Sequence, residues 1–389
     1  MRRRHFVCGA PALLLAATTS RAAAGPVRRA AVIGSTGRGN YGHGMDRVFR
    51  DRPGIEVVAL ADPNPAGADK ARAAAGARRV YGDYREMLER ERPELVSVAP
   101  RWSEEHHPMV RAALEAGAHV YCEKPFTRTL AEADDLLAVA RAAGRRIAVA
   151  HQGRLSPATL ALKARLEAGE FGELREIRIN GKQDRRAGGE DLLVLGTHQF
   201  DLVRLFAGDP LWCTARILQG AREVTLGDAR AATEGVGPVL GDAIDAFLAL
   251  PRGVAVHYTS RAGGAAAAGS WGMELICSRG RVRLLNDPIT QVFVSREEKG
   301  GADGWRRREW EPLSPGLAGA EALRGGQDLA NRRVVDDWLS AIAEGREPAC
   351  SGFAAMKSLE IIHAILRAGL TRGRVALPLS DRAHPLAAA

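Results

Sequence analysis

Short apolar runs alternate with amphipathic segments along the first third of the chain. The apolar runs lie at residues 30–33, 57–61, 95–99, 120–122 and 147–150. Between them are alanine- and arginine-rich segments with helical spacing, such as 108–116 and 130–143. Strands that alternate with helices at this spacing form parallel sheets. Residues 27–150 therefore predict a doubly wound, Rossmann-type α/β domain.

The pattern changes after residue 150. A helical segment at 158–168 is followed by runs in which polar and apolar residues alternate without helical crossovers, at 175–180, 254–260, 273–277 and 282–285. Such alternation is typical of an antiparallel sheet with one solvated face. We therefore expect residues 151–385 to form a second, α+β domain with an open, mainly antiparallel sheet.

Residues 1–24 resemble a twin-arginine export signal. Arg3 and Arg4 precede a moderately apolar stretch, 7–18, and an alanine triplet ending at Ala24 fits an A-x-A cleavage site. The stretch is too short for a transmembrane helix, and a proline interrupts it. We expect a periplasmic or secreted protein, exported folded, without stable membrane insertion. The alternative is a disordered basic start on a cytoplasmic enzyme.

Composition and charge indicate which classes of partner the chain is suited to bind. The 389 residues are 46% hydrophobic and 26% charged, which is typical of a globular chain of two domains. The formal charge is +9, but four of the 55 basic residues lie in the leader, which leaves +5. Aromatic residues make up 5%, too few for a base-stacking surface, so we expect no nucleic-acid partner. The four cysteines after the leader lack C-x-x-C spacing, which favours core thiols over a metal site or disulfides.

The first strand runs into a glycine-rich loop, Gly34-Ser35-Thr36-Gly37-Arg38-Gly39. Glycines between a first strand and a helix let backbone amides approach a pyrophosphate at the helix N-terminus. The loop departs from G-x-G-x-x-G, since Thr36 takes the middle glycine position. Asp62 ends the second strand, 23 residues beyond Gly39, where a carboxylate accepts hydrogen bonds from a ribose. That carboxylate repels a 2′-phosphate and favours NAD over NADP, although Arg38 could neutralise such a phosphate.

With these pieces in order, the chain resembles the Gfo/Idh/MocA oxidoreductase family, named for glucose-fructose oxidoreductase and inositol dehydrogenase. The resemblance covers nearly all of the chain after the leader. It is carried by the glycine loop, Tyr81-Gly82-Asp83-Tyr84, the run from Val96 through His107 to Ala116, and Glu123-Lys124-Pro125. It implies that Lys124 reaches the nicotinamide and the substrate hydroxyl. It also implies a second domain that binds substrate and assembles a homodimer or homotetramer through its open sheet face.

The resemblance extends to a second motif and to the end of the chain. Residues 188–201 match the family pattern D-x-G-x-H-x-x-D, which implies that His198 is a catalytic acid/base or orients substrate. Asp201 would bind substrate or support the histidine. The family's aspartate is Val194 here, and Asp191 and Asp184 are the candidates to replace it. The last helical segments, 328–343 and 352–368, are expected to pack back on the domain junction.

Other residues near these motifs have less defined roles. His151 and Arg154 follow the last strand of the first domain, where either could meet substrate or cofactor. His106 and His107 are expected to be cap or packing residues. Residues 305–310, rich in tryptophan and arginine, are expected to form a solvated strand or loop.

The leading hypothesis is an exported NAD-dependent oxidoreductase that acts on a secondary hydroxyl of a sugar, polyol or glycoside. No nicotinamide pool exists outside the cytoplasm, so the cofactor would be tightly bound and recycled in place. Two alternatives are a glycosidase that works through transient ring oxidation and a non-catalytic sugar-binding relative. The predicted catalytic residues are Lys124 and His198; the substrate-binding residues are Asp201, Asp191, His151 and Arg154; the cofactor-binding residues are Gly34, Thr36, Gly37, Arg38, Gly39, Asp62, Glu123, Lys124 and Pro125.

Overall fold

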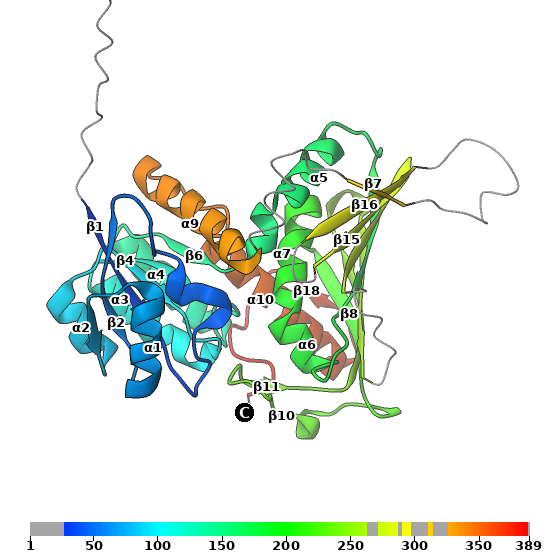
Figure 1. Ribbon diagram of the computed structural model, residues 1–389. Coiled ribbons are helices and arrows are strands. Elements are labelled where there is room, and N and C mark those ends of the chain that lie inside the picture. Colours follow the sequence, from blue (N-terminus) through cyan, green and yellow to red (C-terminus); the bar gives the residue numbers. More distant parts are fainter. Residues whose placement is uncertain (1–26, 263–270, 287–289, 297–309, 314–325, 388–389) are drawn as a thin grey trace, which may run out of the picture.

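The computed structural model describes residues 27–387 apart from 263–270, 287–289, 297–309 and 314–325. Its first part is a six-stranded parallel sheet, on the left of Figure 1. The strands lie in the order β3 (Arg79–Tyr81), β2 (Ile55–Ala61), β1 (Arg28–Ile33), β4 (Leu95–Val98), β5 (His119–Cys122) and β6 (Ile147–Val149). The α-helices between them are α1 (Pro65–Ala75), α2 (Tyr84–Glu91), α3 (His106–Glu115) and α4 (Leu130–Ala142). The predicted Rossmann-type fold is confirmed.

The central strands of this sheet are apolar on both faces. Every residue of β4 is buried, as are the last four of β1, so consecutive side chains meet packed neighbours on either side. That is why these strands appear in the sequence as continuous apolar runs. The edge strand β3 was not among the predicted strands, because its three residues are partly or fully exposed and carry no apolar run.

The segment after the glycine loop differs from expectation. We expected an α-helix whose N-terminus binds phosphate, but the structure has a 3₁₀ helix, η1 (Gly42–Arg47). Inside it His43 (φ 47°) and Gly44 (φ 80°) adopt left-handed conformations, which interrupt regular helical geometry. The amides of the loop itself, rather than those of an α-helix, are therefore the donors that this part of the fold offers to a phosphate.

The second part is built on a large mixed sheet, on the right of Figure 1. Its strands run in the order β17 (Glu311–Pro312), β16 (Gln291–Arg296), β15 (Gly280–Leu285), β14 (Gly272–Cys277), β7 (Leu174–Asn180), β13 (Ala255–Arg261), β12 (Ala243–Ala249), β8 (Trp212–Gln219) and β18 (Val375–Ala376). Each neighbouring pair is antiparallel except β7 and β13. The prediction of an open, mainly antiparallel sheet is confirmed, although β8, β12 and β16 were not among the predicted runs.

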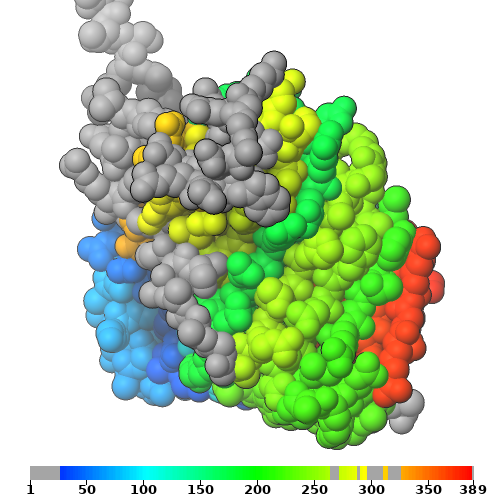
Figure 2. Space-filling view, turned by 90° about the vertical axis from the view of Figure 1, so that its right-hand side faces the viewer, coloured from blue at the N-terminus to red at the C-terminus, as the bar shows by residue number. Residues whose placement is uncertain are grey.

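One face of this sheet packs on helices and the other is open. The inner face lies against α5 (Pro157–Glu167), α6 (Gly189–Val194) and α7 (Gly196–Ala207), and Figure 2 looks onto the outer face. In β7 the side chains of Ile177 and Ile179 are buried while Arg178 between them is exposed. This two-residue period gave the strand its alternating sequence.

Two long C-terminal helices lie between the two parts of the molecule. Helix α9 (Gly326–Glu344) contacts η1 of the first domain and η3 (Gln152–Leu155), which follows β6. Helix α10 (Gly352–Thr371) contacts α4 of the first domain and both α7 and β8 of the second. The α9 and α10 helices therefore connect the two domains, as Figure 1 shows in orange and red.

The number and spacing of the cysteines predicted core thiols. Cys122, Cys213, Cys277 and Cys350 are buried and unpaired, so the prediction of core thiols is confirmed. No described helix combines the length and apolar character needed to cross a bilayer. Within the same residues, no cluster of three or more His, Cys, Asp or Glu side chains forms a metal-ligand set. The predicted solvated segment at 305–310 lies, apart from its last residue, outside the described residues.

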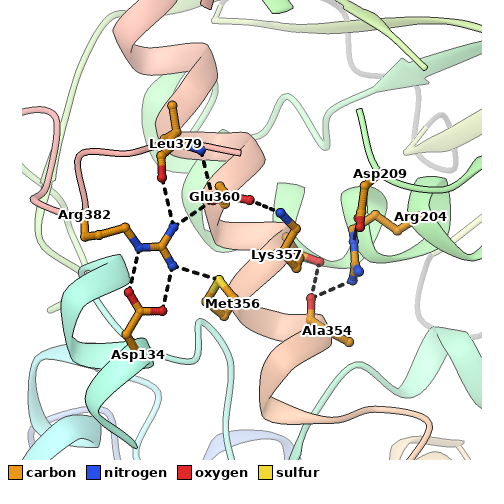
Figure 3. Close-up of polar contacts among 10 residues, drawn as sticks. Asp134, Arg204, Asp209, Ala354, Met356, Lys357, Glu360, Leu379 and Arg382 are labelled. Carbon is orange, nitrogen blue, oxygen red and sulfur yellow. Dashed lines mark hydrogen bonds and ion pairs between the residues drawn. The ribbon is translucent and has the colours of Figure 1, made fainter. Parts of the chain in front are cut away.

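A buried carboxylate fixes the C-terminal segment to both domains. Glu360 of α10 is 1% exposed and accepts hydrogen bonds from Arg382 (2.7 Å), from the amide of Leu379 (3.2 Å) and from Lys357. Arg382 also donates to both oxygens of Asp134 on α4, at 2.7 and 2.8 Å. Figure 3 shows how Arg382 lies between the two carboxylates and so connects the chain terminus to α10 and to the first domain.

Glu360→Ala should lower the free energy of unfolding by about 3–5 kcal/mol, because it leaves the largely buried Lys357 without its counter-charge and Arg382 with Asp134 alone. The matched control is Glu344→Ala, which removes an exposed carboxylate at the end of α9 and should cost much less. Urea unfolding followed by circular dichroism measures both. Equal losses in the two variants would contradict the role given to Glu360.

Candidate active site

The glycine loop is a tight turn directly after β1. The amides of Arg38 and Asn40 both donate to the Ser35 carbonyl at 2.9 Å, which closes the turn. Gly37 has a φ of 89°, and a Cβ built there would meet nothing within 4 Å. The backbone at Gly37 is thus unobstructed on that side. A loop of this kind fits the close approach of a pyrophosphate.

Two further glycines let the loop pack against neighbouring strand ends. A Cβ on Gly39 would lie 2.7 Å from the backbone nitrogens of Arg101 and Trp102, beyond the end of β4. A Cβ on Gly42 would collide with the Glu123 side chain at the end of β5. The missing side chains therefore bring the loop against the two strand ends where the rest of the site is assembled.

Asp62 stands at the end of β2, as predicted, and is 2% exposed. It accepts hydrogen bonds from the Thr36 amide (3.1 and 3.2 Å), the Thr36 hydroxyl (2.7 Å), the Tyr41 hydroxyl (2.7 Å) and the Asn64 amide (2.9 Å). Burial and the carboxylate raise the pKa of Tyr41, which keeps that hydroxyl a donor. The Thr36 and Tyr41 hydroxyls both donate to one Asp62 oxygen in this structure, so a ribose diol would take their place, and ribose binding by Asp62 stays a prediction.

Arg38 bears on the choice between NAD and NADP. Its guanidinium pairs with Glu104 at 2.8 Å and with Glu105 at 2.9 Å. These two carboxylates compensate its charge, so Arg38 is poorly placed to neutralise a 2′-phosphate. Together with Asp62, this geometry favours NAD.

Glu123 joins the loop to the end of β5. The carboxylate is fully buried, and it accepts a hydrogen bond from the Lys124 amide and pairs with His43 of η1. Burial alone would raise the pKa of Glu123, but His43 and Lys124 outweigh it and lower the pKa to about 2. Glu123 is therefore ionised and acts as a fixed anchor between η1 and Lys124.

Lys124 follows directly and is 5% exposed. Its Nζ donates to the Val194 carbonyl at 3.2 Å, and burial lowers its pKa. The Lys124–Pro125 peptide is cis. His106 supports this turn, because its Nδ1 lies 2.8 Å from the Pro125 carbonyl and its Nε2 lies 2.6 Å from the Pro100 carbonyl. His106, predicted to be a cap or packing residue, thus packs against the turn at Lys124–Pro125.

Lys124 and His198 line one cavity of about 250 Å³ at the junction of the two domains. His43 and Arg101 of the first domain lie on its wall, together with Lys182, Glu234, Trp271 and Asn286 of the second. The His198 ring lies edge-on to His151, with centroids 5.4 Å apart. Burial, with Lys124 and His151 nearby, lowers the pKa of His198 well below its usual value. The histidine is therefore neutral at physiological pH.

Three of the predicted substrate-binding residues form a layer behind His198 rather than the cavity wall. Arg154 donates to both oxygens of Asp201 at 2.8–3.1 Å, and Asp201 is 1% exposed. His151 lies 3.9 Å from Asp201, and burial lowers its pKa to about 4. Asp201 and Arg154 satisfy each other, which fits the alternative that Asp201 supports the histidine; that Asp201, His151 and Arg154 bind substrate stays a prediction.

The replacement for the family's aspartate is not where we expected it. Asp191 accepts hydrogen bonds from Ser260 (2.6 Å) and from the amides of Lys182 (3.2 Å) and Gln183 (3.1 Å). Asp184 pairs with Arg186 at 2.7 Å. Neither Asp191 nor Asp184 lines the cavity.

Among the described residues, the carboxylate that does line the cavity is Glu234. It lies between β10 (Arg230–Ala231) and β11 (Pro238–Val239), 3.2 Å from Arg186. No sequence motif identifies Glu234, Trp271 or Asn286, because they come from loops and strand ends that only the folded chain brings together. Lys182 alone had a positional signal, as the second residue after a predicted strand.

Comparisons with known proteins agree with the fold and the site. Residues 28–151 match the model of an oxidoreductase family with an NAD-binding Rossmann fold, and residues 159–283 match the Gfo/Idh/MocA C-terminal domain. D-apiose dehydrogenase of Paraburkholderia graminis is 27% identical over 338 residues, which cover 84% of each chain. D-glucoside 3-dehydrogenase of Escherichia coli is 30% identical over 200 residues, 47% of this chain and 54% of that protein.

Solved structures show the same fold. Levoglucosan dehydrogenase in complex with NADH and levoglucosan matches with a TM-score of 0.73 at 20% identity, over 90% of this chain and 100% of that one. An NAD binding oxidoreductase from Klebsiella pneumoniae matches with a TM-score of 0.72 at 22% identity, over 91% of this chain and 100% of that one. With the family models, these matches identify the cofactor domain as NAD-binding.

Glu234→Gln should move the rising limb of the pH–rate profile for alcohol oxidation to lower pH. Glu234 raises the pKa of Lys124, and the Arg186 that it neutralises lowers it, so both consequences of the substitution make the ammonium easier to deprotonate. Initial rates of NADH formation across the pH range measure the limb. Glu167→Gln, an exposed carboxylate on α5, is the control and should leave the profile in place. A limb that stays or moves upward in Glu234→Gln would refute this coupling.

Proposed function

Because this chain belongs to the Gfo/Idh/MocA family of NAD-binding oxidoreductases, we propose that it transfers hydride between NAD and a secondary hydroxyl carbon of a sugar or glycoside. The observation that carries this proposal is that Lys124 and His198, from different domains, line one cavity. Lys124 is held at its edge by the Glu123 anchor, next to the loop that fits a pyrophosphate. A proton acceptor and a hydride carrier would thus meet at the same substrate carbon.

The residues divide the chemistry between them. Bound NAD supplies the hydride acceptor or donor. Lys124, whose pKa burial lowers, takes the hydroxyl proton when the alcohol is oxidised and returns it in reduction. The Val194 carbonyl orients its amine, and the neutral ring of His198 can hold the same hydroxyl by a hydrogen bond.

The relatives support a sugar as substrate. D-apiose dehydrogenase and levoglucosan dehydrogenase carry the names of sugar substrates, and the second was solved with levoglucosan and NADH. A cavity of about 250 Å³ has room for roughly one sugar ring.

Lys124→Ala should abolish turnover while NAD stays bound, since the glycine loop and Asp62 hold the dinucleotide independently. His198→Ala should lower turnover by roughly 10²–10⁴-fold, as is usual for a lost acid/base group. Glycosides are screened by mass for the loss of two hydrogens, and both variants are then assayed with the accepted glycoside. Near-normal turnover in Lys124→Ala would overturn the catalytic assignment of Lys124. Binding of a glycoside to the wild type with no change in nicotinamide absorbance would favour a non-catalytic sugar-binding protein. Release of free sugar by wild-type enzyme alone, without a keto-sugar, would identify a glycosidase that works through transient oxidation.

We further propose that the protein is exported folded, with NAD already bound. The support is the leader pattern of paired arginines, apolar stretch and alanine triplet in residues 1–24, which lie outside the described residues. In a compartment without a nicotinamide pool, the cofactor would have to be regenerated within the site, by a second substrate or by a redox-neutral cycle.

Replacing Arg3 and Arg4 by lysine should retain the protein in the cytoplasm with its leader uncleaved, because a twin-arginine receptor reads the arginine pair. Arg21→Lys, which changes an arginine outside the pair, should be exported normally. Immunoblots of fractionated cells measure both. Normal export of the double variant would refute the folded-export proposal and the recycling that follows from it.

A homodimer or homotetramer through the open face of the large sheet is also proposed. This face bears a shallow surface lined by Arg178, Thr214, Asp245, Phe247 and His257, which combines charged, polar and aromatic side chains. A monomer in analytical ultracentrifugation at micromolar concentration would contradict this proposal.

A further inference from the structure

One wall of the cavity carries hydrogen-bond donors that have no acceptor. Lys182, Trp271 and Asn286 all line it. The Nε1 of Trp271 and the Nδ2 of Asn286 are buried, and neither has a hydrogen-bond partner among the described residues. Lys182 likewise forms no ion pair with a carboxylate in the described ranges. Buried polar groups are normally satisfied, so donors of this kind point to a ligand rich in acceptor oxygens.

These three side chains are adjacent and held in place. The backbone amide of Asn286 donates to the backbone carbonyl of Trp271 at 3.0 Å, across the end of the β14–β15 pair. The Lys182 Nζ lies 5.6 Å from the centre of the Trp271 ring. Behind the lysine, the fully buried Asp191 accepts from the Lys182 amide and from Ser260, which fixes the backbone that presents the ammonium. The wall is therefore a preformed group of donors.

The carboxylates of Asp184 and Glu234, which lie near this wall of the cavity, are both paired with Arg186. Arg186 is paired with Asp184 at 2.7 Å and with Glu234 at 3.2 Å, so the cavity's carboxylate is already engaged. Where the family has an aspartate, Val194 offers only its backbone carbonyl, and Lys124 takes it. Among the described residues, the ammonium of Lys182 has no carboxylate paired with it, and Asp184, whose pKa its charge helps to lower, is held by Arg186; this arrangement favours an anionic ligand.

We propose that the substrate is a sugar acid, a uronic or aldonic acid or its glycoside, whose carboxylate binds Lys182 together with Trp271 and Asn286. This rests on the proposed function, which places the reacting carbon at Lys124 and His198. The His198 and Trp271 rings have centroids 6.4 Å apart, so the carboxylate subsite lies about one sugar ring from the catalytic residues. Arg101 of the first domain and Arg333 of α9 also line the cavity, but the Lys182 wall itself offers one ammonium with neutral donors, which matches a monovalent carboxylate better than a phosphate dianion, for which arginine forks are typical.

The test assays the NAD-loaded protein with matched glycosides that differ only in the acid group: methyl glucuronide against methyl glucoside, and methyl galacturonide against methyl galactoside. The acid of a pair should have the higher kcat/KM, by about 10- to 100-fold, the value of one charge-assisted hydrogen bond. Lys182→Met should remove most of that preference. Lys163→Met, which deletes an exposed lysine on α5, should preserve it.

Binding is measured separately from turnover. Calorimetry with glucuronate and the NAD-loaded protein should show binding in wild type and its loss in Lys182→Met. If no glycoside is oxidised but glucuronate binds through Lys182, the carboxylate site stands and the proposed hydride transfer fails. If neutral glycosides are oxidised as well as their acids, and Lys182→Met lowers both equally, the inference is wrong while the function holds. Preference for glucose 6-phosphate over both would also refute a carboxylate subsite.

Discussion

The buried carboxylate of Glu123 is the interaction on which the site depends. It holds His43 of the segment after the glycine loop and the amide of Lys124 at the end of β5. Gly42 leaves the space that this contact needs. A fully buried anion without these partners would be strongly destabilising, so loop and strand end must keep their relative position. Glu123 thereby fixes the position of Lys124 relative to the glycine loop.

In the described part of the chain, several charged side chains near the cavity are paired with one another, and others are not. Arg154 with Asp201, Arg186 with Asp184 and Glu234, and Arg38 with Glu104 and Glu105 each compensate one another. Such pairs hold the side chains in place, and because their charges largely cancel, little net charge remains to attract a ligand. The amine of Lys124, the ring of His198 and the ammonium of Lys182 form no such pair among the described residues. Burial lowers the pKa of Lys124 and of His198. Arg101 and Arg333 also line the cavity.

Features that depend on residues close to one another in the sequence were predicted. Buried parallel strands are continuous apolar runs, so β1, β2, β4, β5 and β6 were located within about two residues, and the Lys124 and His198 motifs lie next to regular elements. Residues whose roles depend on distant partners were not predicted. Asp191 and Asp201 looked like ligands because a carboxylate near a histidine motif is a common ligand, and only the fold shows that Ser260 and Arg154 occupy them. Glu234 lies in a loop that no pattern marks.

The valine at position 194 links these observations. An aspartate there would compensate the ammonium of Lys124 and make the cavity more nearly neutral. With Val194 buried, Lys124 keeps a backbone carbonyl and the charges of Glu123 and Glu234 but no carboxylate at position 194, so its charged form is less stabilised and its amine is a readier base. The same loss of negative charge leaves the opposite wall, with Lys182, more positive. One substitution thus favours both a lower lysine pKa and an anionic substrate, because each follows from removing one carboxylate from a partly desolvated cavity.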